Sequence, residues 1–224
     1  MRMRRRNLVY DLDHLGSYDE LMNGPLQRDE ALLLYALVRV VRPATVVEIG
    51  FLVGHGSRNL LRAMDPAARL YAFDIEARSQ KAADELMAQD ARLTFRLRSQ
   101  TEIGPDDIEG RQADLVFLDA SHDLALNQET FARLQSMMAP RGILAVHDTG
   151  AVPRPLMEAA GHWATEVPEL WVDDECEVAP DERAFVNWIL EEHPGWGQLH
   201  LHSRRTVRCG LTLLQRSAPL PRPA

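Results

Sequence analysis

Two aspartates, Asp119 and Asp148, each come shortly after an apolar run that is typical of a buried strand. The runs are Asp114 to Leu118 and residues 143–146. Parallel strands end at one edge of a sheet, so the two carboxylates can converge although they are far apart in the sequence. Converging carboxylates raise each other's pKa unless a cation lies between them, and a hard divalent ion such as Mg²⁺ binds through oxygen. The pair therefore predicts a metal site, and the alternative is one helix cap and one solvated side chain.

Two histidines accompany these aspartates. His147 directly precedes Asp148. Its ring can add a nitrogen ligand, or it can point away from the metal and support the residues that bind it. An imidazole ligand would favour Mn²⁺ or another transition metal over Mg²⁺. His122 lies in the turn that follows Asp119, near any substrate group that the metal binds. Because histidine titrates near neutral pH, we predict that His122 is a general base, and the alternative is a loop histidine without a catalytic role.

The stretch 45–57 carries a third set of candidate residues. A β-branched apolar run leads into three glycines, Gly50, Gly54 and Gly56, and a helical pattern follows. A strand, glycine turn and helix in this order bring backbone close to a nucleotide-like ligand. Glu48 comes just before Gly50, and a carboxylate at a strand end repels a diphosphate but suits a cation. The alternative is a structural glycine turn in another doubly wound protein.

Polar residues also end the second and third predicted strands. Asp74 ends the second strand, where a carboxylate can accept hydrogen bonds from both hydroxyls of a ribose. Ser99 and Gln100 follow the third strand, where a hydroxyl and an amide can contact an adenine edge. Ligands of open α/β sheets bind beyond the carboxyl ends of the strands, so these side chains are expected to share one site. For Asp74 the alternative is a helix N-cap.

Alternating strands and helices must position these residues. We expect strands at residues 45–49, 69–73, 93–97, 114–118 and 143–146, and helices at 27–41, 59–64, 79–89 and 124–138. A helix at 181–192 and two strands at 198–202 and 210–214 follow. The alternation predicts an α/β fold, in which a doubly wound, mostly parallel, seven-stranded Rossmann-like sheet ends in an antiparallel hairpin.

One domain is expected to hold all 224 residues. We divide it into an N-terminal arm (1–23), a cofactor-binding core (24–150), and a C-terminal helix and hairpin (181–217). Between them, residues 151–180 contain four prolines, two tryptophans and an acidic cluster. This change of character predicts a substrate-side insertion, and a solvated loop is the alternative.

The composition argues against some classes of partner and some cellular locations. A net charge of -8 argues against a nucleic-acid-binding surface, which is normally basic. The longest apolar run, 31–38, is too short to cross a membrane, and the basic N-terminal residues do not lead into the apolar segment of a signal peptide. Two cysteines make neither a disulfide framework nor a zinc site. We therefore expect a cytoplasmic protein with no nucleic-acid or membrane partner.

The pattern E-x-G-x-x-x-G that begins at Glu48 resembles motif I of class I methyltransferases, whose cofactor is S-adenosylmethionine. The layout over 27–150 is similar to the catechol O-methyltransferase family, which has an acidic residue after strand two, Ser-Gln after strand three, a metal aspartate after strand four and Asp-Asn after strand five. Thr149 replaces that asparagine, and His122 stands where the family has a catalytic lysine. The resemblance implies cofactor contacts from Glu48, Gly50, Leu52, Gly54, Ser57, Asp74, Ile75, Ser99, Gln100 and Asp119. It implies that Asp119, His147 and Asp148 bind Mg²⁺ or Mn²⁺.

The runs 118–122 and 147–149, Leu-Asp-Ala-Ser-His and His-Asp-Thr, are more similar to sugar O-methyltransferases of actinobacterial macrolide and polysaccharide pathways. That resemblance implies a small sugar or glycoside as the hydroxyl acceptor, and it allows for a homodimer. A sugar hydroxyl is less acidic than a catechol, so it needs both metal polarisation and a base. In the implied mechanism the metal binds the acceptor oxygen, His122 removes its proton, and the alkoxide attacks the sulfonium methyl in line.

Two other functions fit parts of the pattern. One is an accessory protein that binds S-adenosylmethionine without turnover, against which the intact metal pair argues. The other is a nicotinamide-dependent oxidoreductase, whose fingerprint needs tighter glycine spacing and no carboxylate at Glu48.

Overall fold

A computed structural model describes residues 26, 28–150, 152–153, 171–173, 177–201 and 210–216 of the chain. Seven strands form one sheet in the order β3-β2-β1-β4-β5-β10-β9. Their bounds are β1 Thr45–Ile49, β2 Arg69–Asp74, β3 Leu93–Leu97, β4 Ala113–Leu118, β5 Met138–Val146, β9 Trp196–Leu201 and β10 Leu211–Arg216. Strands β1 to β5 pair in parallel, and β10 runs antiparallel to both β5 and β9. The predicted α/β sheet with its C-terminal antiparallel hairpin is confirmed.

The order of the strands determines where a ligand crevice opens. The chain runs from β1 to β2 and β3 on one side, and then returns to β4 on the other side of β1. The connections after β1 and β4 therefore leave in opposite directions, which opens a crevice at the carboxyl ends of these two strands. Both strands are almost entirely buried, as expected for central strands of a sheet that is covered on both faces.

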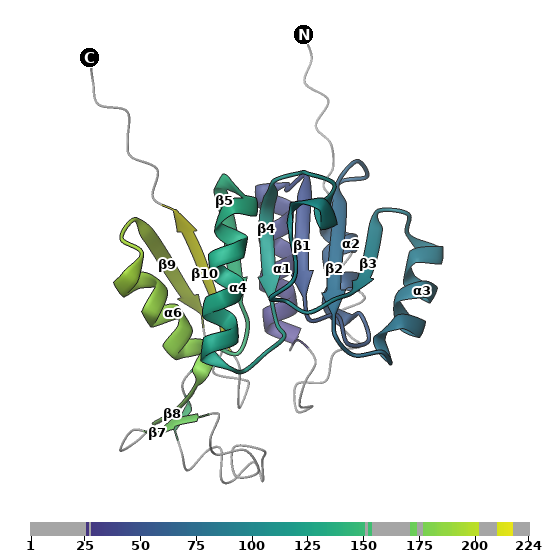
Figure 1. Ribbon diagram of the computed structural model, residues 1–224. Helices are drawn as coiled ribbons and strands as arrows, with labels where there is room; N and C mark the ends of the chain where they lie inside the picture. The colour runs from purple at the N-terminus through teal and green to yellow at the C-terminus, as the bar shows by residue number, and fades with distance from the viewer. Residues whose placement is uncertain are drawn as a thin grey trace, which may run out of the picture.

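Helices cover both faces of the sheet (Figure 1). On one face α1 (Arg28–Val41), α2 (His55–Ala63) and α3 (Ser79–Gln89) enclose an apolar cluster with the strands. On the other face α4 (Leu124–Met137) and α6 (Asp181–Glu192) enclose a second cluster. A short 3-10 helix, η2 (Pro105–Ile108), precedes β4 and contributes to this second cluster. The predicted helices are therefore present, although α2 begins earlier than residue 59 and α4 ends before residue 138.

The fifth strand is longer than the sequence predicted. It begins at Met138 instead of Ile143, and Met138 pairs with Ala113 before the register shifts. Such an irregularity tolerates Pro140, which cannot donate to a ladder of hydrogen bonds. A Cβ on Gly142 would lie 2.8 Å from the Ala113 carbonyl oxygen, so the glycine allows the two backbones to approach. The proline and glycine that predicted a turn therefore lie inside an irregular strand.

A second, small sheet lies between β5 and α6 in the chain. Strands β6 (Val152–Pro153), β7 (Trp171–Asp173) and β8 (Glu177–Pro180) pair antiparallel in the order β6-β8-β7. This sheet lies beyond the carboxyl ends of the parallel strands, and β8 leads directly into α6 (Figure 1). The arm 1–23 and most of the predicted insertion 151–180 fall outside the described residues, so their roles stay predictions.

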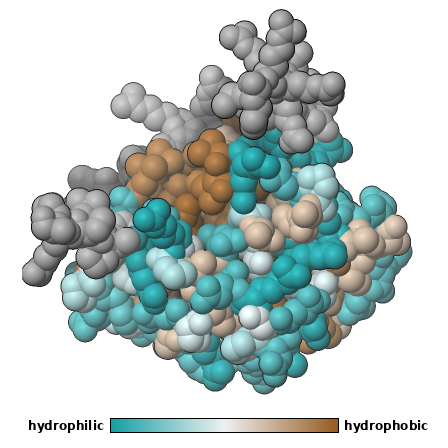
Figure 2. All heavy atoms as spheres, turned by 90° about the horizontal axis from the view of Figure 1, so that it is seen from above, coloured by the Kyte–Doolittle hydropathy of each residue, from teal (hydrophilic) through white to brown (hydrophobic). Residues whose placement is uncertain are grey.

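The amino-terminal edge of the parallel strands presents a mixed surface (Figure 2). Polar side chains cover most of this face, and apolar ones gather in one area. Val40 and Val41, at the end of α1, are exposed by 82% and 39%. Among the described residues, every helix is too short or too polar to pass through a membrane. The ligand crevice lies at the opposite edge of the sheet.

Candidate active site

A cavity of about 390 Å³ opens at the carboxyl ends of the central strands, where the strand order predicts a crevice. It brings together most of the site residues expected from the sequence: Gly50, Leu52, Asp74, Ile75, Ser99, Gln100, Asp119, His122 and Asp148. Four other expected residues lie outside its lining: Glu48, Gly54, Ser57 and His147. The cavity therefore extends from the glycine turn after β1 to the aspartates that follow β4 and β5.

The glycine turn packs directly against the end of β4. Gly50 has a φ of 100°, and a Cβ there would lie 1.7 Å from the carbonyl oxygen of Asp119. The Gly50 N–H donates to the Phe73 carbonyl at 2.9 Å, and the Asp119 N–H donates to Ile49 at 2.8 Å. Only glycine has both the backbone freedom and the small size that this position requires. The turn thereby places its backbone beside the predicted metal aspartate.

Asp74 holds the other side of the same turn. Its Oδ2 accepts the backbone N–H groups of Phe51 at 3.0 Å and Leu52 at 2.6 Å, and its Oδ1 accepts that of Glu76 at 2.8 Å. Leu52 has a φ of 49°, an unfavourable value for a side chain of this kind, and the carboxylate stabilises it there. Helix α3 is capped at Arg78, so Asp74 is not its N-cap. A contact between Asp74 and a ribose stays a prediction.

Glu48 lies beneath the turn and not in the cavity. Its side chain accepts a hydrogen bond from the Ser57 hydroxyl, and a Cβ on Gly56 would lie 2.2 Å from its Oε1. Burial raises the pKa of Glu48 to about 8, so its carboxyl is mostly neutral at neutral pH. Glu48 and Ser57 therefore stabilise the start of α2 from its buried side. Their predicted part in cofactor binding stays a prediction.

Gln100 connects the end of β3 to α4. Its amide group donates to Asn127 Oδ1 at 3.1 Å and to Thr130 Oγ1 at 2.8 Å. The Ser99 hydroxyl shares a hydrogen bond of 3.1 Å with Thr101. Both residues line the cavity, and their own hydrogen bonds fix the shape of this wall.

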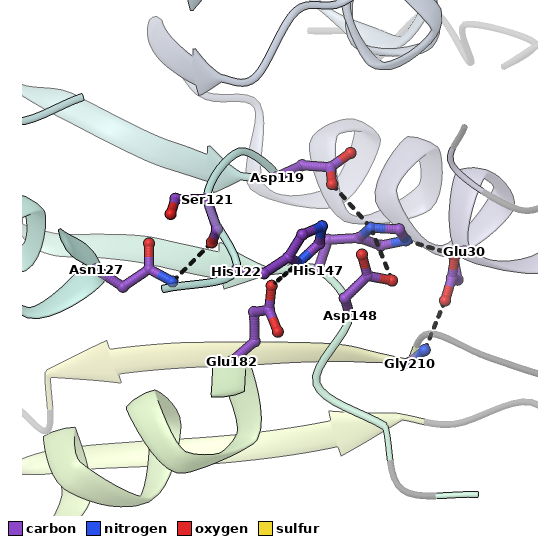
Figure 3. A network of polar contacts seen from close by, with 9 residues as sticks. All are labelled: Glu30, Asp119, Ser121, His122, Asn127, His147, Asp148, Glu182 and Gly210. Carbon is purple, nitrogen blue, oxygen red and sulfur yellow. Dashed lines mark hydrogen bonds and ion pairs between the residues drawn. The ribbon is translucent and has the colours of Figure 1, made fainter. Parts of the chain in front are cut away.

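Asp119, His147 and Asp148 form one cluster of potential metal ligands, with one ligand atom from each lying within 4.8 Å of the others. His147 Nδ1 lies 3.0 Å from Asp119 Oδ1 and 3.5 Å from Asp148 Oδ1 (Figure 3). Helix α4 is capped by Asp123, so the alternative in which Asp119 caps this helix does not hold. Two carboxylates and an imidazole are a donor set that suits a divalent cation with affinity for both oxygen and nitrogen.

The ring of His147 is enclosed by carboxylates. It is 1% exposed, and its Nε2 lies 2.8 Å from Glu30 Oε2, which comes from α1. Burial disfavours the charged ring, but the three surrounding carboxylates raise the pKa of His147 well above its usual value. Without a metal, the protonated ring donates to Glu30 and Asp119. Three carboxylates around one protonated imidazole leave the cluster with an excess of negative charge, which a bound cation would offset.

His122 forms a second histidine–carboxylate pair at the wall of the cavity. Its Nδ1 contacts Glu182 Oε1, and Glu182 is the second residue of α6 (Figure 3). This hydrogen bond raises the pKa of His122, against the effect of partial burial. The side chain of His122 is 36% exposed, whereas that of Glu182 is 6% exposed. Among the described residues, Glu182 Oε2 is buried without a hydrogen-bond partner.

Residues 47–149 match a protein family described as a methyltransferase domain. The sheet order, with its antiparallel last strand, is the one expected for the class I fold. Residues 47–149 thus match a methyltransferase domain, and the sheet that contains them has the class I fold. This confirms the predicted S-adenosylmethionine-dependent methyltransferase and argues against a nicotinamide-dependent oxidoreductase. A search of curated proteins by sequence gave no match.

Solved structures of other methyltransferases have a similar fold. The O-methyltransferase TomG from Streptomyces achromogenes, involved in tomaymycin synthesis and in complex with S-adenosylmethionine, is 18% identical, with a TM-score of 0.64 over 95% of this chain and 93% of that one. An O-methyltransferase from Bacillus cereus with S-adenosylhomocysteine is 17% identical, with a TM-score of 0.61 over 88% and 84%. The N-methyltransferase NodS from Bradyrhizobium japonicum is 16% identical, with a TM-score of 0.59 over 92% and 97%. Because O- and N-methyltransferases share this fold, the acceptor atom must be inferred from the site.

The sequence patterns did not predict two carboxylates of the candidate site, Glu30 and Glu182, which contact His147 and His122. Both are almost fully buried, at 5% and 4% exposure, and neither belongs to a motif. Each lies on the buried side of its helix, Glu30 beside Leu34 one turn later and Glu182 beside Phe185 and Val186. A carboxylate on an apolar helix face needs a partner, and that pattern could have indicated both residues.

Proposed function

We propose that the protein is an S-adenosylmethionine-dependent O-methyltransferase that methylates a hydroxyl of a small acceptor, a sugar or a glycoside. The observation that carries this proposal is the pair of clusters at one end of the cavity. Asp148 belongs to both, since it joins Asp119 and His147 in one and His122 and Glu182 in the other. A methyl acceptor placed there would lie between potential metal ligands and a potential base.

The methyl donor is expected at the glycine-turn end of the cavity. The backbone of Gly50 and the side chains of Asp74 and Ile75 line this end. The structures of TomG and of the Bacillus cereus enzyme contain S-adenosylmethionine and S-adenosylhomocysteine, which supports this cofactor for the same fold. Gly54, Ser57 and Glu48 would act indirectly, by holding the turn from below.

Asp119, His147 and Asp148 would hold a Mg²⁺ or Mn²⁺ ion. When bound, the ion would supply positive charge that makes a nearby hydroxyl more acidic. The remaining steps belong to the protein. His122, oriented by Glu182, takes the hydroxyl proton on Nε2 because its Nδ1 faces Glu182. The acceptor oxygen then bonds to the methyl carbon as the carbon–sulfur bond breaks, which yields the methyl ether, S-adenosylhomocysteine and a protonated His122.

A sugar hydroxyl as acceptor fits the presence of both a potential metal site and a potential base, because an alcohol requires charge stabilisation and a base together. The catechol family also has a metal site and a catalytic base, so it is the resemblance of two sequence runs that favours a sugar. The runs 118–122 and 147–149, which resemble sugar O-methyltransferases, contain both features.

Calorimetry with S-adenosylhomocysteine, with and without Mn²⁺, followed by turnover assays on a panel of sugars, catechols and amines, tests the proposal. We expect cofactor binding in either condition, and methylation of a sugar hydroxyl only with metal. Methylation of amines alone would contradict the O-methyltransferase assignment. Cofactor binding without turnover on any acceptor would favour an accessory protein.

A further inference from the structure

Glu30 is a buried carboxylate whose two oxygens both have defined partners. Oε2 lies 2.8 Å from His147 Nε2, and Oε1 accepts the backbone N–H of Gly210 at 2.7 Å. These contacts join three parts of the chain: helix α1, the end of β5 and the start of β10 (Figure 3). The carboxylate therefore fixes the ring of His147 in relation to two other elements of the fold.

The chemistry of the pair determines which ring nitrogen faces the cluster. An ionised carboxylate only accepts hydrogen bonds, so the hydrogen between Glu30 and His147 lies on Nε2. In a neutral imidazole the lone pair is then on Nδ1. Nδ1 is the nitrogen that lies 3.0 Å from Asp119 Oδ1 and 3.5 Å from Asp148 Oδ1. In the neutral ring, the form that can bind a metal, the lone pair of His147 is thus directed toward the two predicted metal carboxylates.

Packing keeps the ring in this orientation. His147 is 1% exposed, and the Phe117 ring meets it edge-on, with centroids 6.2 Å apart. The Thr149 N–H donates to the Gly210 carbonyl at 3.3 Å, which ties the residues after His147 to the same strand that contacts Glu30. A rotation of the ring would separate Nε2 from its acceptor in a buried place, which is unfavourable.

We infer that Glu30 is a positioning residue that makes His147 Nδ1 a metal ligand and so directs the site toward metals with affinity for imidazole, such as Mn²⁺, over Mg²⁺. The inference rests on the proposed metal site. Carboxylate partners of this kind orient a histidine ligand and increase its basicity, and their loss typically lowers metal affinity by about 10–100-fold. Mg²⁺ prefers oxygen ligands, so its binding depends less on this ring.

Glu30→Gln tests the inference, because a glutamine side chain has one acceptor oxygen, whereas the two oxygens of Glu30 face two donors, His147 Nε2 and the Gly210 N–H. Metal titrations of the full chain, without cofactor or acceptor, would measure Mn²⁺ and Mg²⁺ affinity. Electron spin echo spectra of bound Mn²⁺ would detect coupling to an imidazole nitrogen. We expect the variant to bind Mn²⁺ about 10–100-fold more weakly, with a smaller loss for Mg²⁺ and a diminished nitrogen coupling. His147→Gln should abolish the coupling.

Glu85→Gln is the matched control, since Glu85 is exposed on α3 and the change in net charge is the same. A purely structural role of Glu30 would lower thermal stability equally with and without Mn²⁺, whereas the positioning role also reduces the stabilisation that Mn²⁺ adds. If Glu30→Gln does not fold, Glu30→Asp replaces it, and its shorter side chain should still weaken Mn²⁺ binding.

Three outcomes would overturn the inference. Unchanged Mn²⁺ affinity in the Glu30 variant would remove the positioning role, and bound Mn²⁺ without nitrogen coupling in the wild type would remove His147 as a ligand. In the first case the proposed function would stand with the same three ligands, and in the second it would stand with an all-oxygen site. Failure of the wild type to bind either metal would instead remove the metal from the proposed function as well.

Discussion

Two histidine–carboxylate pairs lie in this site, in clusters that share Asp148, and they differ in burial and in orientation. His147 is 1% exposed and directs Nε2 to Glu30, whereas His122 is 36% exposed and directs Nδ1 to Glu182. In both pairs the carboxylate comes from a helix and is almost fully buried. An imidazole and a carboxylate can therefore serve different purposes. The purpose depends on which ring nitrogen bonds to the carboxylate and on whether the ring lines the cavity.

The difference has a physical consequence for each ring. Around His147, burial opposes the charged form and three carboxylates favour it, so the ring needs either a proton or a cation beside it. His122 lines the cavity, where it can exchange a proton with a ligand or with water. We therefore propose that the buried pair binds the metal and that the accessible pair transfers the proton, and four experiments test this division.

Removing the metal should have the largest effect. Excess chelator is expected to abolish turnover, and added Mn²⁺ or Mg²⁺ should restore it, because Asp119, His147 and Asp148 would then hold no cation. A coupled assay for S-adenosylhomocysteine release would follow both steps. Full activity in chelator would exclude a catalytic role for a metal bound by Asp119, His147 and Asp148, while the methyltransferase assignment would stand.

The second experiment, His122→Ala, tests the proposed role of His122 as the general base. We expect kcat to fall by about 10²–10⁴-fold, the usual contribution of a general base. Affinity for Mn²⁺ and for S-adenosylhomocysteine should stay near wild type, because the proposed ligands of both lie elsewhere. If His122 were instead a metal ligand through the cluster with Asp148 and Glu182, the variant would lose metal affinity, and added cation would rescue it. A wild-type kcat would exclude His122 as the base.

Asp74→Ala should separate the cofactor end of the cavity from both histidine pairs. The variant leaves three backbone N–H groups without their acceptor, those of Phe51 and Leu52 in the turn and that of Glu76 after β2. We expect S-adenosylhomocysteine affinity to weaken by about 1–3 kcal/mol, with Mn²⁺ affinity unchanged. Calorimetry would measure both. Unchanged cofactor affinity would show that the turn keeps its shape without this carboxylate and that Asp74 does not bind the ribose.

The sequence predicted much of the sheet and the chain segments that surround the cavity. Runs such as Ala113–Leu118 are buried on both faces, so their apolar pattern alone predicts a central parallel strand. Gly50 and Asp74 follow from local rules, because a sharp turn needs a glycine and a strand end in this class carries a polar residue. The strand order then follows from the connections, and it brings together residues far apart in the chain.

The histidine partners could not be predicted in the same way. Glu30 reaches His147 across 117 positions, and Glu182 reaches His122 across 60, through the packing of α1 and α6 on opposite faces of the sheet. A local pattern can mark a carboxylate on an apolar helix face, but it contains no information about which strand end or which histidine that carboxylate meets. Similarly, Pro140 and Gly142 have the composition of a turn, and only the pairing with Ala113 makes this segment part of a strand.

Glu182→Gln should have the smallest effect and gives the sharpest test of the comparison. The hydrogen bond from Glu182 raises the pKa of His122, and a base acts only when it is unprotonated. In the wild type, kcat should rise as pH passes the raised pKa and then level off. With the carboxylate removed the pKa falls, so the variant's profile should rise at lower pH than that of the wild type. Its plateau should be lower by about tenfold, because the weaker base is also less well oriented.

The matched control for this variant is Glu191→Gln, which removes the same charge from an exposed position on α6 and should keep the wild-type profile. Mn²⁺ affinity should differ little between the two variants, in contrast to the loss expected for Glu30→Gln. If the Glu182 variant kept the wild-type pH profile, His122 would not be the group whose deprotonation controls the rate. If it lost Mn²⁺ affinity as the Glu30 variant does, both pairs would serve the metal, and the base would have to come from another residue of the cavity.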